Sequence, residues 1–108
     1  MTEWDVDFAR SELADARSLA VSGEVDLSSA GRFAQELTSV VGDGGTAVVD
    51  LSGVTFIDSS GVRELLAANR LAAALGGQLV LADPSAACRR VLEISGVWDE
   101  FIVRKTQT

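Results

Sequence analysis

The spacing of apolar residues changes several times along the chain, and each change predicts a different element of secondary structure. Residues 47–49 form a short, mostly β-branched apolar run, which is typical of a strand covered on both faces. After residue 61, apolar positions recur every three or four residues, which indicates one face of a helix. The turn between them is Asp58-Ser59-Ser60-Gly61. Aspartate and serine accept hydrogen bonds from the free N–H groups of a helix start, so this turn is expected to cap the helix.

Along the whole chain, the spacing of apolar residues predicts strands and helices in a largely alternating order. The predicted elements are strands at 4–8 and 18–21, a helix capped by Ser28 or Ser29 and ending near 41, a strand at 46–57 interrupted at 52–53, a helix from Ser60 to about Leu75, a strand at 78–82, a helix at 86–94, a short element at 97–98 and a small strand at 101–103. A polar turn is expected at 12–17. The core face of the second helix is expected to include Leu65, Leu66, Ala72 and Ala73.

The order of the predicted elements indicates the fold class. Strands linked by helices favour parallel neighbours with right-handed crossovers, whereas the first two strands are expected to form an antiparallel hairpin. The prediction is therefore an α/β fold with a mixed, mainly parallel β-sheet.

Length, composition and charge narrow the class of protein further. The 108 residues, 47% of them apolar, fit a single domain over 1–108, with a core at about 4–103 and a polar tail at 104–108. The net charge of −7 argues against direct nucleic-acid binding, which depends on basic residues. It suits a basic protein partner, although acidity also serves solubility alone. No basic and apolar leader begins the sequence and no apolar run reaches about 20 residues, so we expect a cytoplasmic protein with no membrane contact.

Residue types needed for several kinds of catalysis are missing or isolated. The chain has no histidine, which excludes a Ser-His-Asp triad and removes the commonest zinc ligand. Its single cysteine, Cys88, cannot form an internal disulfide, and its position beside Val91 and Leu92 indicates a small buried hydrophobe. Asp50, inside an apolar strand, is expected to make structural hydrogen bonds. We therefore predict a protein that is not an enzyme and has no catalytic residues, no metal and no cofactor.

Three segments together give the sequence a specific resemblance. They are Gly23-Glu24-Val25-Asp26, the strand sequence VVDLSGV and the FIDSSG that follows it. In this combination the chain resembles the anti-sigma factor antagonists of the STAS domain family, over about residues 19–101. The resemblance implies a STAS-like domain with its helices mostly on one side of the sheet. In that family the first serine of the DSSG turn is phosphorylated by a partner kinase that is also the anti-sigma factor, and by position this serine is Ser59.

The resemblance also implies partners and one partner-binding residue. The unphosphorylated form is expected to bind the anti-sigma factor kinase and so release a bacterial sigma factor, while phosphorylation of Ser59 switches this binding off. A phosphatase is a further expected partner. The aspartate that matches Asp26 contributes to partner binding in the family. Independently of the resemblance, strand ends that precede helices gather on one edge of an α/β sheet, so Asp26 and Ser59 are expected to be neighbours. The expected partner-binding residues on this edge are Asp26, Asp58, Ser60 and Gly61, with Ser28 and Arg63 at its margin.

Several of these residues also have a structural explanation. A serine in such a turn is an ordinary helix cap, and Ser60 is expected to be the cap or to assist the turn. Asp26 fits an Asx turn or a favourable charge at a helix start. Gly61 either relaxes the turn or admits the backbone of a partner.

Two other classes of function fit parts of the sequence: a STAS-type accessory subunit, and a flavodoxin-like receiver or small hydrolase. A STAS-type accessory subunit of a bacterial lipid transporter would use the same fold and a similar turn for docking, without phosphorylation. A receiver domain would need clustered acidic residues after its first strand and a lysine late in the fold, whereas the sole lysine, Lys105, lies in the tail. A small hydrolase would need a second catalytic group near the turn. The Asp-Ser-Ser-Gly turn favours the regulatory function.

Overall fold

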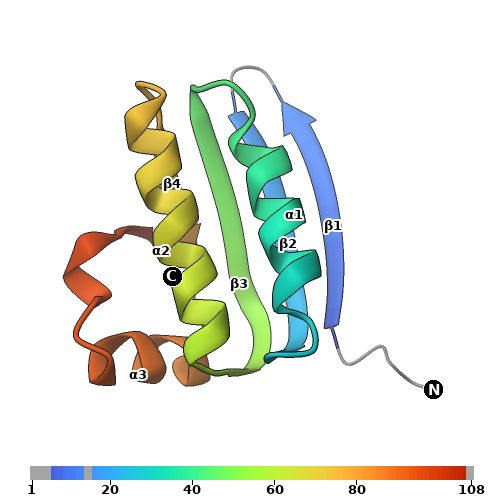
Figure 1. Cartoon of the computed structure of the whole chain (residues 1–108), viewed down its shortest axis with the longest axis vertical. Coiled ribbons are helices and arrows are strands. Elements are labelled where there is room, and N and C mark those ends of the chain that lie inside the picture. The colour runs from blue at the N-terminus through green and yellow to red at the C-terminus, as the bar shows by residue number, and fades with distance from the viewer. Residues whose placement is uncertain (1–5, 14–15, 107–108) are drawn as a thin grey trace.

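One β-sheet, in which every strand lies beside its neighbour in the sequence, forms the centre of the fold (Figure 1). The computed structural model describes residues 6–13 and 16–106. The strands in this part of the chain are β1 (Val6–Leu13), β2 (Ala16–Val25), β3 (Thr46–Ile57), β4 (Gln78–Ala82) and β5 (Ile102–Arg104). β1 and β2 are antiparallel, and all the other neighbours are parallel. The predicted mixed, mainly parallel sheet is confirmed.

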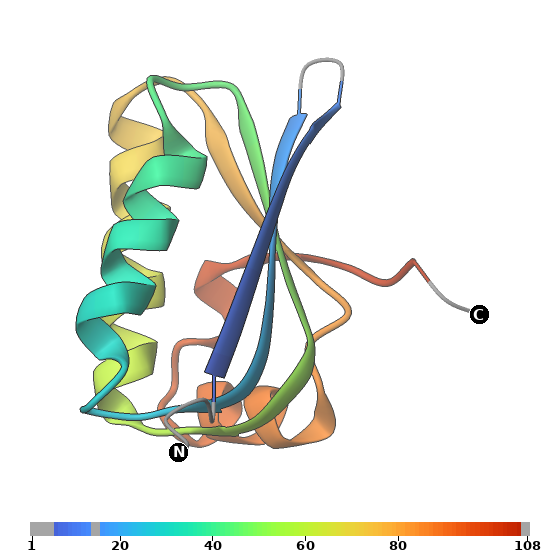
Figure 2. The same cartoon turned by 90° about the vertical axis from the view of Figure 1, so that its right-hand side faces the viewer.

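The helices lie mostly on one side of this sheet, as the resemblance implied (Figure 2). They are α1 (Ala30–Val41), α2 (Ser59–Ala74), α3 (Ala86–Ile94) and the short 3₁₀ helix η1 (Trp98–Glu100). α1 and α2 lie side by side over one face, and α3 lies at the end of the sheet where β3 ends (Figures 1 and 2). Because β2 and β3 are parallel, the starts of α1 and α2 come to the same end of the molecule.

Apolar side chains from the sheet and from all three helices meet in one core. The largest fully buried members are Phe33, Leu19, Leu37, Leu51, Ile57, Leu65, Leu79, Leu81 and Leu92. Phe33 of α1 stacks on Phe8 of β1, with ring centroids 6.1 Å apart. Of the expected core face of α2, Leu65 and Ala72 are buried and the half-buried Leu66 packs against the core, but Ala73 is exposed. The buried stripe follows Leu65, Ala68 and Ala72, so a residue directly after Ala72 is turned towards solvent.

The strands differ from the sequence-based prediction in several places. β1 and β2 extend into the expected polar turn, since Leu13 pairs with Ala16. The first residues of the predicted strand at 4–8 lie outside the described part of the chain. β3 runs without a break through Ser52 and Gly53, because β2 adjusts its register there. A Cβ at Gly53 would lie 2.8 Å from Ser22 Cβ, so the glycine allows the close approach of β2.

The side chain of Arg17, on β2, closes the C-terminal end of α1. Its Nε donates to the Val40 carbonyl at 2.8 Å and its Nη2 to the Val41 carbonyl at 2.7 Å. Nη2 also donates to the carbonyl of Gly44, in the connection to β3. The last carbonyls of a helix have no partner within the helix, so the guanidinium supplies hydrogen bonds that the backbone cannot make. Arg17 therefore joins β2 to the end of α1.

We predict that Arg17→Ala lowers the free energy of unfolding by about 1–3 kcal/mol, because it leaves half-buried carbonyls without donors. Urea unfolding followed by circular dichroism measures this loss. Arg90→Ala is the matched control, since Arg90 is an exposed arginine of α3 and should change stability by less than about 0.5 kcal/mol. Equal stability of the two variants would contradict the role of Arg17.

Candidate functional site

Asp58 begins the helix at the end of β3. It is the N-cap of α2, with extended backbone, and its Oδ1 accepts from the Ser60 N–H at 2.9 Å and the Gly61 N–H at 3.4 Å. The Ser60 hydroxyl donates a short hydrogen bond to the same oxygen. These donors, the Ser60 hydroxyl above all, hold the pKa of Asp58 below its ordinary value, against the opposing effects of desolvation and of the Asp26 charge. The Asp58 carboxylate is therefore ionised at neutral pH.

Asp26 organises the corresponding turn at the end of β2. Its Oδ1 accepts from the Ser28 hydroxyl at 2.7 Å, from the Ser28 N–H at 3.0 Å and from the Ser29 N–H at 3.3 Å. The Ser28 hydroxyl contributes most to lowering the pKa of Asp26. Ser29 occupies the N-cap position of α1 but makes no capping hydrogen bond, because its Oγ accepts from the Asp26 N–H instead. The Asx turn expected for Asp26 is thus present.

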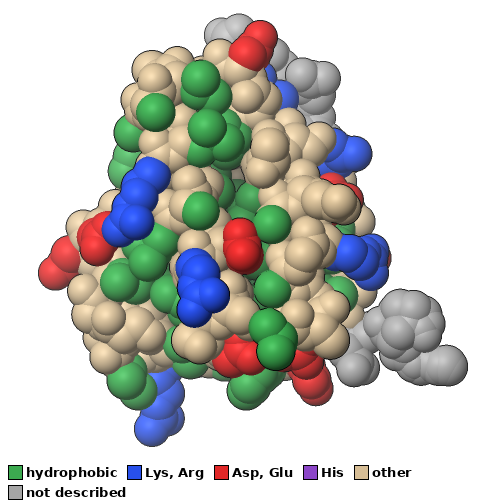
Figure 3. Space-filling model, viewed as in Figure 1, with side chains coloured by type: hydrophobic (Ala, Val, Ile, Leu, Met, Phe, Trp, Pro, Cys, Tyr) green, Lys and Arg blue, Asp and Glu red, His purple; other side chains and the backbone are tan. Residues whose placement is uncertain are grey.

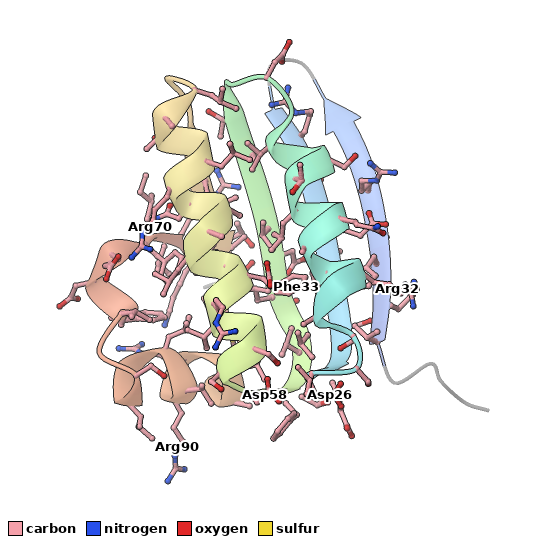
Figure 4. All side chains as sticks on the ribbon, viewed as in Figure 1. Asp26, Arg32, Phe33, Asp58, Arg70 and Arg90 are labelled. Carbon is pink, nitrogen blue, oxygen red and sulfur yellow. The ribbon has the colours of Figure 1, made fainter. Side chains whose placement is uncertain are left out.

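The structure brings these two turns together, as the sequence predicted. The Asp58 N–H donates to the Val25 carbonyl at 3.1 Å, which ties the end of β3 to the end of β2. The negative charge of Asp26 raises the pKa of Asp58 slightly, which is the effect of a nearby like charge. Figure 4 shows Asp26 and Asp58 at the same end of the molecule, beneath the starts of α1 and α2. Two ionised carboxylates therefore share one surface.

The two serines of the turn differ in what they offer to a partner. Ser60 is half-buried, and its hydroxyl is already used by Asp58. Ser59 is exposed at the first position of α2, and within residues 6–13 and 16–106 no hydrogen bond involves its hydroxyl. Of the two roles expected for Ser60, the structure gives it that of assisting the turn, because Asp58 is the cap. Ser59 carries the accessible hydroxyl.

The structure gives a reason for glycine at position 61 that the sequence did not reveal. A Cβ at this position would lie 2.8 Å from Ile57 Cγ1 and 2.8 Å from Val25 Cγ1, closer than carbon atoms approach. Gly61 is buried, so the missing side chain lets the first turn of α2 pack on the ends of β2 and β3. The glycine thus serves the protein's own core.

The surroundings of the turns combine acidic, basic and apolar groups. Ser28 and Arg63 are exposed beside them, as expected for residues at the margin of the site. Leu27 and Phe56 are large apolar residues that are exposed beside the two turns, and the sequence did not predict this exposure. Figure 3 shows hydrophobic and acidic side chains next to one another along the lower end of the molecule. In the sequence, the one indication that Leu27 and Phe56 belong to this surface was their position. Leu27 follows Asp26 directly, and Phe56 is two residues before Asp58.

Other chemistry is not assembled in the described part of the chain. Burial raises the pKa of the Cys88 thiol to about 12, so this residue is an unreactive core thiol at neutral pH. Asp50 makes the expected structural hydrogen bond, with its Oδ1 accepting from the Ser52 N–H at 2.9 Å. Residues 6–13 and 16–106 contain no group of three or more potential metal-ligating side chains. None of the helices described is long and apolar enough to cross a membrane.

Comparison with protein families identifies the family to which this fold belongs. The family described as "Mlab, STAS domain" matches residues 8–104, which is most of the chain. The protein therefore belongs to the STAS domain family. No curated protein matches the sequence.

The solved structures that this chain resembles include anti-sigma factor antagonists. An anti-sigma factor antagonist from Mycobacterium paratuberculosis is 25% identical, with a TM-score of 0.82, covering 96% of this chain and 90% of that one. The anti-sigma factor antagonist SpoIIAA of Bacillus is 23% identical in both its unphosphorylated and its phosphorylated form. Their TM-scores are 0.75 and 0.69, covering 90% of this chain and 87% and 90% of those chains. The murine anion transporter Slc26a9 is 23% identical, with a TM-score of 0.71 over 84% of this chain and 15% of the transporter.

We predict that Gly61→Ala lowers the free energy of unfolding by about 1–3 kcal/mol, because the new methyl group overpacks the contact with Val25 and Ile57. Gly31→Ala is the matched control, since it adds the same methyl group to a helix where nothing lies within 4 Å of it. That change should stabilise the protein by about 0.5–1 kcal/mol through helix propensity. Thermal or urea unfolding of both variants tests the contrast, and destabilisation by both alike would refute it.

We predict that the cap made by Asp58 is lost in acid. Because its folded pKa lies below 3.8, the charged carboxylate stabilises the fold above that pH and ceases to do so as the pH falls through the folded pKa. Asp58→Ala should cost about 1 kcal/mol at neutral pH, and the gap to the wild type should narrow in acid. Asp58→Asn keeps an acceptor for the cap but cannot titrate. Urea unfolding at several pH values checks this, and a gap independent of pH would contradict it.

Proposed function

We propose that this protein is an anti-sigma factor antagonist whose binding is switched off by phosphorylation of Ser59. Its unmodified form binds a serine kinase that is also the anti-sigma factor, and so releases the sigma factor. The observation that supports the proposal most is the contrast between the two serines. The Ser59 hydroxyl is exposed beside two ionised carboxylates, whereas the Ser60 hydroxyl is bonded to Asp58.

In the proposed phosphoryl transfer, this chain supplies only the attacking hydroxyl group. The Ser59 oxygen attacks the γ-phosphorus of ATP held by the kinase, its proton passes to a base of the kinase, and ADP leaves. Magnesium, nucleotide and base belong to the kinase, so this protein acts as a substrate and regulator without an activity of its own. That SpoIIAA has been solved in a phosphorylated form supports the same role for the STAS fold here.

Phosphorylation at this position changes the surface more than the fold. A phosphoserine carries about −1.5 to −2 charge at neutral pH. At the first position of α2 the free N–H groups and the helix dipole favour an anion, so the helix tolerates it. The new charge lies near the carboxylates of Asp26 and Asp58, on the face that a partner covers. Repulsion and the cost of desolvating the phosphate then speed dissociation of the complex.

A second candidate function keeps the surface but omits the modification. The matching family includes Mlab in its description, and the STAS fold recurs in the anion transporter Slc26a9. The chain would then be an accessory subunit of a bacterial lipid transporter and would dock through the Asp26 and Asp58 turns. Neighbouring reading frames discriminate: a serine kinase or sigma factor supports the switch, and a permease with an ATPase supports the subunit.

We predict that incubation with the cognate kinase and ATP adds one phosphoryl group, on Ser59. Ser59→Ala should bind the kinase permanently and resist inactivation, while Ser59→Asp should bind poorly, because a carboxylate partly imitates phosphate. Ser60→Ala is the matched control, since it removes a hydroxyl from the adjacent residue and should still be phosphorylated. Peptide mass spectrometry locates the phosphate, and binding assays compare the variants.

A phosphoryl group on Ser60 instead of Ser59 would overturn the assignment of the acceptor. Absence of phosphate on both serines, with an active kinase that binds the chain, would overturn the switch and favour the accessory subunit.

A further inference from the structure

Two large apolar side chains are exposed beside the acidic turns. Leu27 follows Asp26 directly and is 79% exposed, and Phe56, two residues before Asp58, is 47% exposed. In the β2–β3 ladder Phe56 pairs with Glu24, so it lies at the same end of the sheet as the Asp26 turn. Both residues are therefore near the proposed phosphorylation site, although they come from different segments of the chain.

The protein's own core does not use these side chains. Ile57, the next residue of β3, is 2% exposed and packs in the core. Because successive strand residues point to opposite faces, Phe56 points away from that core. Leu27 lies in the turn before α1, whose buried face begins at Ala30. Single exposed apolar residues are common on protein surfaces. This pair differs because its two members lie beside the two turns of one site.

The charges around the pair indicate what kind of surface would cover it. Glu24 is exposed, and the carboxyl groups of Asp26 and Asp58 both have lowered pKa values. The ion pairs among the described residues include Arg10–Glu36, Arg70–Glu100 and Arg89–Glu93. None of them involves Glu24, Asp26 or Asp58, so these acidic groups are left without a basic partner inside the described chain. A partner with arginine or lysine side chains around apolar pockets complements both features.

We propose that Leu27 and Phe56 are the apolar anchors of the kinase interface, and that the kinase presents two apolar pockets bordered by basic side chains. This rests on the proposed function, because it takes the partner to be the anti-sigma factor kinase. Burial of the two side chains supplies the affinity, while Glu24, Asp26 and Asp58 set the orientation and speed of association.

The anchors also explain how phosphorylation of Ser59 would act on the complex. In the proposed complex, the kinase surface that covers Leu27 and Phe56 also covers Ser59, which lies three residues after Phe56 and follows Asp58 directly. The phosphate is then enclosed by the same contact that buries the anchors. The complex can keep Leu27 and Phe56 buried only if it also desolvates the phosphate. Because that desolvation is costly, the complex dissociates and the two side chains return to solvent.

The test measures binding of the full, unmodified chain to the serine kinase proposed as its partner. Leu27→Ala and Phe56→Ala should each raise the Kd about tenfold or more. Leu75→Ala and Ile102→Ala are controls of similar chemistry, since Leu75 is 44% exposed at the far end of α2 and Ile102 is 48% exposed on β5. The controls should stay within about twofold of the wild type. Raising the salt concentration should slow association of the wild type.

The outcomes separate the anchors from the switch. Unchanged Kd for Leu27→Ala and Phe56→Ala, with Ser59 still phosphorylated, would overturn the anchors and leave the switch intact. Equal weakening by the two controls would also overturn the anchors. Weakening by Leu27→Ala and Phe56→Ala alone, in a complex that is never phosphorylated, would support the anchors and overturn the switch. If the wild-type chain does not bind the kinase, both proposals fall.

Discussion

The structure depends on the contact between the ends of β2 and β3 and the first turn of α2. A hydrogen bond from the Asp58 N–H to the Val25 carbonyl joins the strand ends, and the bare Cα of Gly61 lets the helix rest on Val25 and Ile57. Any side chain at position 61 would separate helix and strands, because neighbouring carbons would be brought within 3 Å. This contact fixes the direction of α2 and places the turns of Asp26 and Asp58 on one surface.

The same carboxylates serve both the fold and the surface. Asp26 and Asp58 each accept several hydrogen bonds from nearby serine hydroxyls and backbone N–H groups, and these bonds keep both side chains charged. A substitution that removes the whole carboxyl group, such as Asp58→Ala, therefore also removes hydrogen bonds from a turn. The hydroxyl of Ser59 makes no hydrogen bond within the described residues, so the proposed phosphorylation would break no structural contact there.

Much of the fold could be predicted because its periodicities are local, but several details depend on distant neighbours. The strand and helix order and the sheet class followed from apolar spacing alone. The continuous β3 could not be predicted, because Ser52 and Gly53 look like a break until Ser22 of the adjacent strand is placed beside them. The roles of Ser59 and Asp26 are predictions from the family resemblance, because apolar spacing alone does not distinguish a modified serine from a helix cap. The exposure of Leu27 and Phe56 was not predictable, since residue type gives no sign of which apolar side chains the core leaves out.

The sheet order β1-β2-β3-β4-β5 follows the chain without a single exchange of positions. Each strand can therefore add to an edge that the preceding segment has already formed, and no strand has to be inserted between two others. Since closing short stretches of chain loses less entropy than joining distant ones, this topology favours rapid folding for a mainly parallel sheet. During synthesis, β1, β2, α1 and β3 can assemble before β4 and α3 leave the ribosome. The strand ends that position Ser59 thus belong to the part of the domain that is completed early.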